Sequence, residues 1–407
     1  MKALRNFSRI IIAPVFIFSG FVKAVDPLGS AYKFTDYFEA FGMDFLIPIA
    51  LALSFILCIT ELVIGLSILM GVTMRFMSWA LLLFMSFFTI LTFISALTSP
   101  VSDCGCFGDA LILTNWQTFW KNIVFMLPTL IVFYGRKRYR PIAPLGSEWG
   151  IVTIFILISV GVTIFNYRHL PVLDFRPYSI GTHIPTDMVI PDDAAVDEYE
   201  TTFIYGKDGE QQEFSIEDIP YTDTNWKYVD RKTTLISKGY EPPIHDFTIT
   251  TTDGYDITDS VLSNTDFSLL VIAHNLEKSK EANLAKTAEL AAKLKEQGIL
   301  VYGMTASSSD KIRAVENETD IDFHTTDEVT LKTIIRSNPG LVLLHNGLIV
   351  NKWHINTAPT VEEIENGIFV SALTYQTGRT SRTAIGFYLL LLVSVFSVMM
   401  LSLRSGD

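Results

Sequence analysis

Long apolar runs and polar stretches alternate along the first 170 residues, and one more apolar run lies near the end of the chain. Each run has about 18 or more residues with almost no charge, which is the length an α-helix needs to cross roughly 30 Å of hydrocarbon. The pattern predicts six membrane-spanning helices, over residues 7–24, 45–71, 76–97, 116–134, 149–167 and 384–402. The first run is not expected to be a cleaved signal, because Lys23 interrupts the region where cleavage would occur. The sequence therefore predicts an integral membrane protein.

Basic residues gather at the N-terminus, between the second and third predicted spans, and after the fourth. Loops rich in Lys and Arg stay on the cytoplasmic side of a membrane. We therefore expect both termini to be cytoplasmic in the cell (inner) membrane, with residues 25–44, 98–115 and 168–383 on the periplasmic, extracytoplasmic side. The basic residues concerned are Lys2, Arg5, Arg9, Arg75, Arg136, Lys137, Arg138 and Arg140.

The distribution of charged residues also differs between the predicted membrane and external parts of the chain. Of 407 residues only 18% are charged, and the formal net charge is −12. Residues 168–383 hold 34 acidic and 19 basic side chains, whereas the remaining residues hold 9 acidic and 12 basic ones. Because phosphate contacts need clustered Lys and Arg, an acidic external part argues against a nucleic-acid partner.

The chain has three cysteines. Cys58 lies within a predicted span and is expected to be a small buried residue. Cys104 and Cys106 flank Gly105 in a loop predicted to be extracytoplasmic, where thiols can pair or exchange. A direct disulfide between them would close a small, strained and reducible ring. Redox exchange and a structural staple both stay open, and metal binding is a weaker third option because the loop has no His and a closed zinc site needs four ligands.

Glu61 is an ionisable residue inside the second predicted span. Such groups are costly in a bilayer and usually face the interior of a bundle. A proton or quinone role is one interpretation, and a neutral, hydrogen-bonded interhelical carboxyl is the plainer one. Lys23, at the outer end of the first span, is expected to extend its ammonium to the membrane interface.

Three segments of the predicted bundle stand out, namely Gly20-Phe-Val-Lys-Ala-Val-Asp-Pro27, Glu61-Leu-Val-Ile-Gly65 with Gly71, and Cys104-Gly-Cys-Phe-Gly108. In these segments residues 1–135 resemble the DoxX family of four-helix membrane proteins, and within it the MauE branch. The resemblance implies redox work at the membrane, such as disulfide formation or maturation of a secreted enzyme. It implies that Cys104 and Cys106 are the reactive thiol pair, that Glu61 is a family position, and that a membrane quinone is a possible electron acceptor. No other cofactor is implied.

The external region begins with residues 168–240, where segments 203–205 and 213–216 predict a β-hairpin around a Gly-Lys-Asp-Gly turn. Beyond it, apolar runs and helical periodicity predict an α/β domain in which strand, helix and strand form a parallel pair. The expected strands are 246–252, 267–273, 299–304, 341–344 and 348–353, and the expected helices are 278–297, 308–317, 327–337 and 359–374.

This order of elements over residues 241–375 resembles the thioredoxin superfamily, with Pro339 at the position of its cis-proline. Thioredoxin-like enzymes carry a reactive cysteine just after the first core strand. Here that stretch reads Ala273-His-Asn-Leu-Glu-Lys278, and the whole domain lacks cysteine. His274 cannot replace a thiolate, so the domain is not itself a thiol oxidoreductase. The surface beside Pro339 and His274 is either a partner-binding surface or part of a degenerate scaffold.

The sequence thus predicts a multi-domain membrane protein with a four-helix bundle, two further membrane helices and an external thioredoxin-like α/β domain. The first functional hypothesis is thiol–disulfide exchange or electron transfer for an exported, periplasmic client through Cys104 and Cys106. The alternative is a non-enzymatic assembly scaffold, and whether the protein is an enzyme stays open. Lipid is the other expected partner, and the sequence predicts no oligomeric state. The predicted units are 1–135, 136–167 (a basic loop and the fifth span), 168–240, 241–375 and 384–402.

Overall fold

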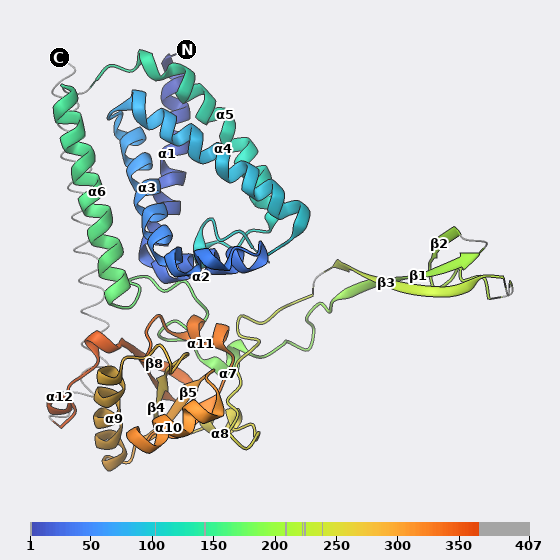
Figure 1. The fold of residues 1–407 in the computed structure, drawn as a ribbon, viewed down its shortest axis with the longest axis vertical. Helices are drawn as coiled ribbons and strands as arrows, with labels where there is room; N and C mark the ends of the chain where they lie inside the picture. The colour runs from blue at the N-terminus through green and yellow to red at the C-terminus, as the bar shows by residue number, and fades with distance from the viewer. Residues whose placement is uncertain are drawn as a thin grey trace.

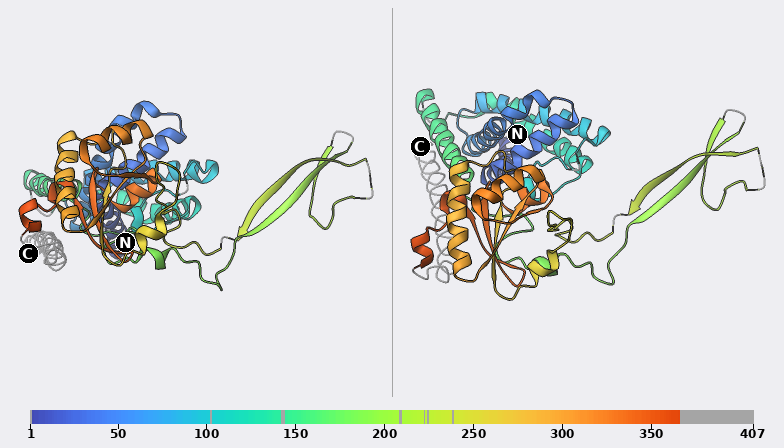
Figure 2. Two further views of the ribbon diagram at one scale, coloured as in Figure 1. Left: turned by 90° about the horizontal axis from the view of Figure 1, so that it is seen from below. Right: turned by 60° about the horizontal axis from the view of Figure 1, so that its bottom comes forward.

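The computed structural model describes residues 2–365, apart from residues 102, 142–143, 208–209, 222, 224 and 238. The sixth predicted span, over residues 384–402, lies outside the described residues. Within them the chain forms a bundle of long helices, an α/β domain beside one end of the bundle, and a narrow β-arm that projects from that domain (Figures 1 and 2). The predicted fold class, membrane helices joined to an external α/β domain, is confirmed.

Within the described residues five helices are long and apolar enough to cross a membrane, so the chain is a multi-pass membrane protein. They are α1 (Lys2–Val25), α3 (Ala50–Met70), α4 (Met74–Thr98), α5 (Asn115–Gly135) and α6 (Leu145–Arg168). α1 packs along α3, and α4 packs along α5. Glycines bring α1 and α3 close together: a Cβ on Gly20 would lie 2.7 Å from the Leu62 nitrogen, and one on Gly65 would lie 2.8 Å from the Ile17 nitrogen.

The two ends of the bundle face different surroundings (Figure 1). At one end the N-terminus, the α3–α4 turn and η3 (Arg136–Arg138) meet: Arg9 donates to the Leu69 carbonyl at 3.0 Å, and Tyr139 donates to the Arg5 carbonyl at 3.2 Å. The other end carries the loop between α4 and α5 and faces the α/β domain. The basic residues of the predicted cytoplasmic loops therefore lie at the end opposite the α/β domain.

Residues 25–44, expected to be a loop, contain a helix. α2 (Pro27–Ala40) is capped by Asp26, whose carboxylate accepts the Gly29 N–H at 2.9 Å, and Pro27 opens its first turn. η1 (Asp44–Ile49) then leads into α3. The prediction failed because α2 is short and has no sustained apolar periodicity, although its capping signal was present in the sequence. α2 lies across the end of the bundle, between it and the α/β domain (Figure 1).

The α/β domain contains a five-stranded sheet in the order β6-β5-β4-β7-β8. β4 pairs in parallel with β5 and antiparallel with β7, which is the arrangement of a thioredoxin-like fold. Alternate residues of β4 enter separate cores: Leu269 and Val271 face one, whereas Leu270 and Ile272 face the other. The strands are β4 (Phe267–Ile272), β5 (Leu300–Thr305), β6 (Phe323–Thr325), β7 (Gly340–His345) and β8 (Leu348–His354); the helices are α8 (Thr258–Leu262), α9 (Glu281–Glu296), α10 (Ser309–Thr319), α11 (Glu328–Ile334) and α12 (Val361–Glu365), with η4 (Ile355–Thr357).

Two edge features differ from the predictions. The stretch 246–252, expected to be a strand, forms only isolated bridges from Thr250 to Asp256 and Thr325, because the turn at Asp253-Gly254 folds it back on itself. β6 was not predicted, since three residues are too few to give a periodic signal. The helix expected over 359–374 is described only as far as Glu365.

The β-arm is an antiparallel sheet in the order β2-β1-β3, and Figure 2 shows it extending well away from the α/β domain. The predicted hairpin corresponds to β1 (Glu198–Lys207) and β2 (Glu210–Phe214). β3 (Lys227–Ser237) was missed because charged residues and threonines interrupt any regular apolar alternation. Tyr205 and Phe214 pack edge to face near the outer end of the arm.

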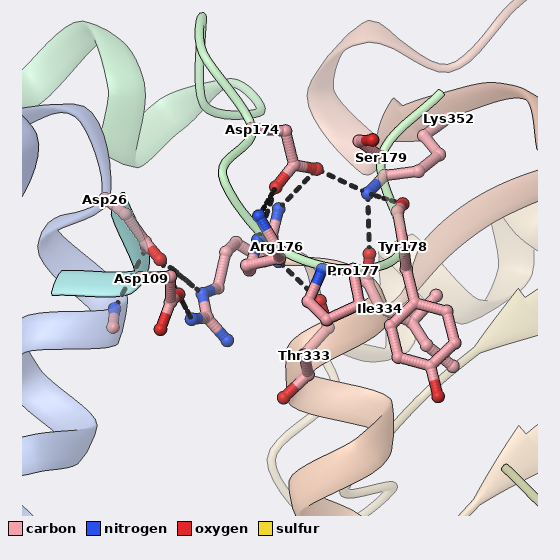
Figure 3. A network of polar contacts seen from close by, with 12 residues as sticks. Asp26, Asp109, Asp174, Arg176, Pro177, Tyr178, Ser179, Thr333, Ile334 and Lys352 are labelled. Carbon is pink, nitrogen blue, oxygen red and sulfur yellow. Dashed lines mark hydrogen bonds and ion pairs between the residues drawn. The ribbon is translucent and has the colours of Figure 1, made fainter. Parts of the chain in front are cut away.

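A buried ion-pair network fixes the segment that leads from α6 through α7 (Ile184–Asp187) to the α/β domain (Figure 3). Asp174 accepts from the Arg176 Nε at 2.7 Å and from the Lys352 Nζ at 2.7 Å. Lys352 also donates to the carbonyls of Tyr178 and Ile334. Burial alone would raise the pKa of Asp174, but the two cations lower it. The segment after the fifth span is thus an integral part of the soluble domain.

Candidate functional site

The cysteine pair lies on residues 103–109, the dithiol loop, between α4 and α5. Cys104 and Cys106 are free thiols whose Sγ atoms lie 3.2 Å apart. Gly105 adopts a φ of +65° between them, a backbone conformation that favours glycine. Cys104 is buried and Cys106 is half-buried, so Cys106 is the more accessible of the two. η2 (Gly108–Ala110) closes the loop.

A buried ion pair supports the loop from inside the bundle. The Lys23 Nζ lies 2.8 Å from Glu61 Oε2 and 2.7 Å from Ser19 Oγ, and it donates to the Cys106 carbonyl at 2.5 Å. The prediction that Lys23 extends to the membrane interface is wrong, because the close α1–α3 contact places Glu61 within its reach. Glu61, on α3, makes interhelical hydrogen bonds with Ser19 and Lys23 on α1. The pair therefore links the membrane interior directly to the dithiol loop.

α2 supports the loop from the outside. Lys33 pairs with Asp103 at 2.5 Å, and the other Asp103 oxygen accepts the Gly105 N–H at 3.0 Å. The Tyr37 hydroxyl is buried close to Cys104 and acts to lower the pKa of that thiol, against the larger effects of Cys106 and of burial. The helix that the sequence did not predict thus covers the thiol pair.

The surroundings shift the pKa values of the two thiols in opposite directions. The hydrogen bond from Cys104, and then the Lys121 and Lys23 ammoniums, together lower the pKa of Cys106 to about 6, against the effect of burial. The same hydrogen bond and burial raise the pKa of Cys104. At neutral pH, Cys106 is accordingly the thiolate and Cys104 the thiol that donates to it. A low-pKa thiolate is the nucleophile of disulfide exchange.

Arg336 joins the α/β domain to this end of the bundle. Its Nη2 lies 2.9 Å from Asp26 Oδ2 and 3.5 Å from Asp109 Oδ2, and its side chain is 7% exposed. Asp26 caps α2, while Asp109 ends the dithiol loop; Figure 3 shows both carboxylates on the same side of the network. Burial would raise the pKa of Asp26, yet Arg336 lowers it. One guanidinium therefore contacts both elements that surround the thiol pair.

The thioredoxin-like face carries Pro339, three residues after Arg336, and its peptide bond with Asn338 is cis. Asn338 Nδ2 donates to the Asn275 carbonyl at 2.7 Å, which holds the loop after β4 against this proline. His274, in that loop, is largely buried; burial, and then the nearby Lys332 ammonium, lower its pKa to about 4. A neutral His274 cannot act as an exchange nucleophile. Within the described residues no hydrogen bond joins either cysteine to His274 or Pro339.

A cavity of about 40 Å³ adjoins Cys106 inside the bundle. Glu61, Lys121 and the Phe84 and Phe88 rings also line it. It has room for about two water molecules, so it does not accommodate a quinone ring as it stands. Among the described residues no group of three or more His, Cys, Asp or Glu side chains is placed to hold a metal ion.

Sequence reasoning missed several residues of this site, namely Asp26, Lys33, Tyr37, Asp103, Asp109, Lys121 and Arg336. Asp26 precedes Pro27 at a helix start, and the two other aspartates flank the cysteine motif, so the sequence contained a signal for each of them. Arg336 and Lys121 become recognisable only when the tertiary contacts are known.

Comparison with known protein families agrees with this division of the chain. Residues 1–135 match the family described as methylamine utilisation protein MauE. The bundle is therefore MauE-like over these residues. Below, the bundle (α1 to α6) is called the membrane or MauE-like half, and the part that follows α6 is called the soluble half. Residues 199–238, which form most of the β-arm, match a domain of unknown function (DUF8463). No significant match is found among curated proteins.

Two solved structures are similar to the part of the chain that follows the MauE-like half. One is a solution structure from Bacteroides thetaiotaomicron, described as a candidate protein disulfide isomerase, with 20% identity and a TM-score of 0.23; the match covers 32% of this chain and 84% of that one. The other is BsSco, of the Sco family of cytochrome c oxidase assembly proteins, in which a disulfide switch has been identified. It has 13% identity and a TM-score of 0.25, over 32% of this chain and 93% of that one. The thioredoxin-like fold itself rests on the strand order and pairing described above.

Removing one member of the Lys23–Glu61 pair is expected to destabilise the MauE-like half. Lys23→Met leaves a buried carboxylate without its cation, which costs about 3–5 kcal/mol in buried pairs. The double variant Lys23→Met/Glu61→Met removes both charges and is expected to recover most of that loss. Thermal unfolding of the full chain in detergent measures both effects. Equal losses of stability in the single and double variants would contradict the assignment.

The pH dependence of alkylation tests the electrostatics of Cys106. In full-length reduced protein carrying Cys58→Ala, the iodoacetamide rate at Cys106 is expected to reach half its maximum near pH 6, instead of near about 8.5 for an ordinary thiol. Lys121→Met should shift this midpoint upward because an ammonium that favours the thiolate is lost. Lys137→Met, at the opposite end of the bundle, is the matched control and should leave the midpoint unchanged.

Proposed function

We propose that this membrane protein exchanges disulfides with an exported client through Cys104 and Cys106. The observation that carries the proposal is a pair of thiols in contact, one with a lowered pKa and half-buried, the other buried and protonated. A structural staple needs no such asymmetry. The loop that carries the pair is held from three sides, by Lys23, Lys33 and Arg336. Exchange needs an accessible thiolate that attacks a disulfide sulfur, and a second thiol beside it can resolve the mixed disulfide.

In the proposed reaction a disulfide of the client accepts the two electrons that the thiol pair gives up. The Cys106 thiolate attacks one sulfur of a client disulfide, a mixed disulfide forms, and the other client sulfur leaves as a thiolate. Cys104 loses its proton and attacks Cys106, which releases the second client thiolate and leaves a Cys104–Cys106 disulfide. Two electrons pass from the pair to the client, and the reverse steps pass a disulfide to a reduced client. This exchange needs no quinone, and the quinone implied by the family resemblance stays a prediction.

The thioredoxin-like domain is proposed to position the reactive loop instead of reacting. The domain has no cysteine and so cannot carry out the thiol–disulfide exchange of thioredoxin-like enzymes. Arg336 places the face that carries Pro339 against α2 and the dithiol loop. A surface that thioredoxin-like enzymes use for an extended substrate chain would here hold a loop of the same polypeptide. The client would then be presented beside this junction.

The orientation follows as a further part of the proposal. The basic end of the bundle would be cytoplasmic together with both termini, and the dithiol loop and residues 168–383 would be extracytoplasmic. What supports this is the separation of the two ends: the arginines and lysines of the loops lie opposite the α/β domain. An oxidising compartment on the side of the cysteines is consistent with exchange.

A non-enzymatic scaffold is the second candidate, and one observation favours it. The soluble domain keeps a thioredoxin-like fold without its nucleophile, which is the state expected of a module retained only for binding. In that case the cysteines would merely hold the loop in shape.

Mixed-disulfide trapping separates the two functions. In cells producing the full chain with Cys58→Ala, replacement of the resolving thiol by Cys104→Ser is expected to leave a client covalently attached to Cys106. The attached client should be released by dithiothreitol and absent from the Cys104→Ser/Cys106→Ser double variant. If no adduct forms although the Cys104→Ser protein folds and reaches the membrane, exchange is excluded and the scaffold is favoured.

A further inference from the structure

A second site lies at the opposite, basic end of the bundle. A cavity of about 280 Å³ opens between the α3–α4 turn, the segment after α5 and the start of α6. Arg75, Arg136 and Arg140 line it, and no described ion pair engages any of the three. Arg136 donates to the Phe133 carbonyl at 2.8 Å, and its guanidinium lies 4.0 Å from the Phe133 ring, so its direction is fixed. We propose that this cavity binds the phosphate headgroup of an anionic phospholipid.

Thr73 and the start of α4 offer further hydrogen-bond donors to an anion in the cavity. Thr73 lines it and is 3% exposed, yet its Oγ1 has no hydrogen-bond partner within the described residues. Thr73 is also the N-cap of α4, and its side chain does not cap the helix, so the positive end of a 25-residue helix faces this region. The one acidic residue in the lining, Glu148, already accepts the Thr73 N–H at 3.2 Å. The cavity therefore combines a positive charge excess with an unused buried hydroxyl.

The surroundings of the cavity select a lipid over a free phosphate. Phe76 lines the cavity and is 53% exposed, and its ring lies 5.5 Å from that of Trp149, which is also exposed. Exposed aromatic rings beside arginines at the ends of spans mark the interface between headgroups and hydrocarbon. Leu83 and Phe87 continue this exposed apolar surface along α4, where acyl chains would lie. Basic pockets between transmembrane helices on the cytoplasmic side are a known form of anionic lipid site.

The site is independent of the dithiol chemistry, so its test does not depend on exchange. Native mass spectrometry of the full chain, extracted in mild detergent and titrated with phosphatidylglycerol or phosphatidylcholine, measures bound lipid. The intact protein is expected to retain phosphatidylglycerol in preference to phosphatidylcholine. Each basic residue near an anionic headgroup changes affinity about fivefold, so Arg75→Gln/Arg140→Gln should weaken phosphatidylglycerol binding about 25-fold.

The matched control is Lys137→Gln/Arg138→Gln, which removes the same charge from neighbouring exposed positions outside the cavity. It should change binding much less than the cavity variant does. Thr73→Val, which removes only the unpartnered hydroxyl, should weaken binding while the chain stays folded. Equal effects of the two charge variants would overturn the proposal in favour of diffuse attraction. Displacement of the lipid by millimolar inorganic phosphate would overturn it in favour of a free-anion site.

Discussion

The contact of Arg336 with Asp26 and Asp109 is the interaction on which the arrangement of this protein depends. Two carboxylates from the membrane half meet one buried guanidinium from the soluble half. A buried cation without a counter-charge is strongly unfavourable, so the three groups stabilise one another only while the halves are docked. Because Asp26 caps α2 and Asp109 ends the dithiol loop, docking the domain also orders the surroundings of the thiols. The position of the α/β domain and the geometry of the dithiol loop are thereby linked.

The cysteines of this chain lie in the membrane half and not in the thioredoxin-like domain. The thioredoxin-like fold, which normally supplies a reactive cysteine, contains none, while the MauE-like half supplies two cysteines on a loop. The bundle contributes the Lys23–Glu61 pair beneath the loop, α2 contributes Lys33 and Tyr37 above it, and α5 contributes Lys121 beside it. The hydrogen bond between the two thiols, together with Lys121 and Lys23, lowers the pKa of Cys106, while the same hydrogen bond and burial raise the pKa of Cys104.

The sequence predicted the architecture well because its signals are local. Five apolar runs gave five spans, alternation of strand and helix gave the thioredoxin-like order, and the cysteine motif was apparent from its spacing. The failures are tertiary in origin. Lys23 sits where a snorkelling lysine would, and only the close glycine contact between α1 and α3 shows that it reaches Glu61 instead. α2 has a capping signal without apolar periodicity, and Arg336 is 310 residues from its partner Asp26 in the chain.

The most direct test of this account is the exposure of the dithiol loop when the guanidinium is removed. In the full chain, hydrogen exchange of residues 103–109 and the rate of maleimide labelling at Cys106 would be compared between Arg336→Met and Arg313→Met, an exposed control on α10. Loss of a buried charge contact predicts that Arg336→Met increases both rates at least about tenfold while the cores of β4 and β7 keep their protection. The control should behave as the unaltered protein does. Unchanged exchange and labelling in Arg336→Met would contradict the account, because the soluble domain would then have no part in holding the reactive loop.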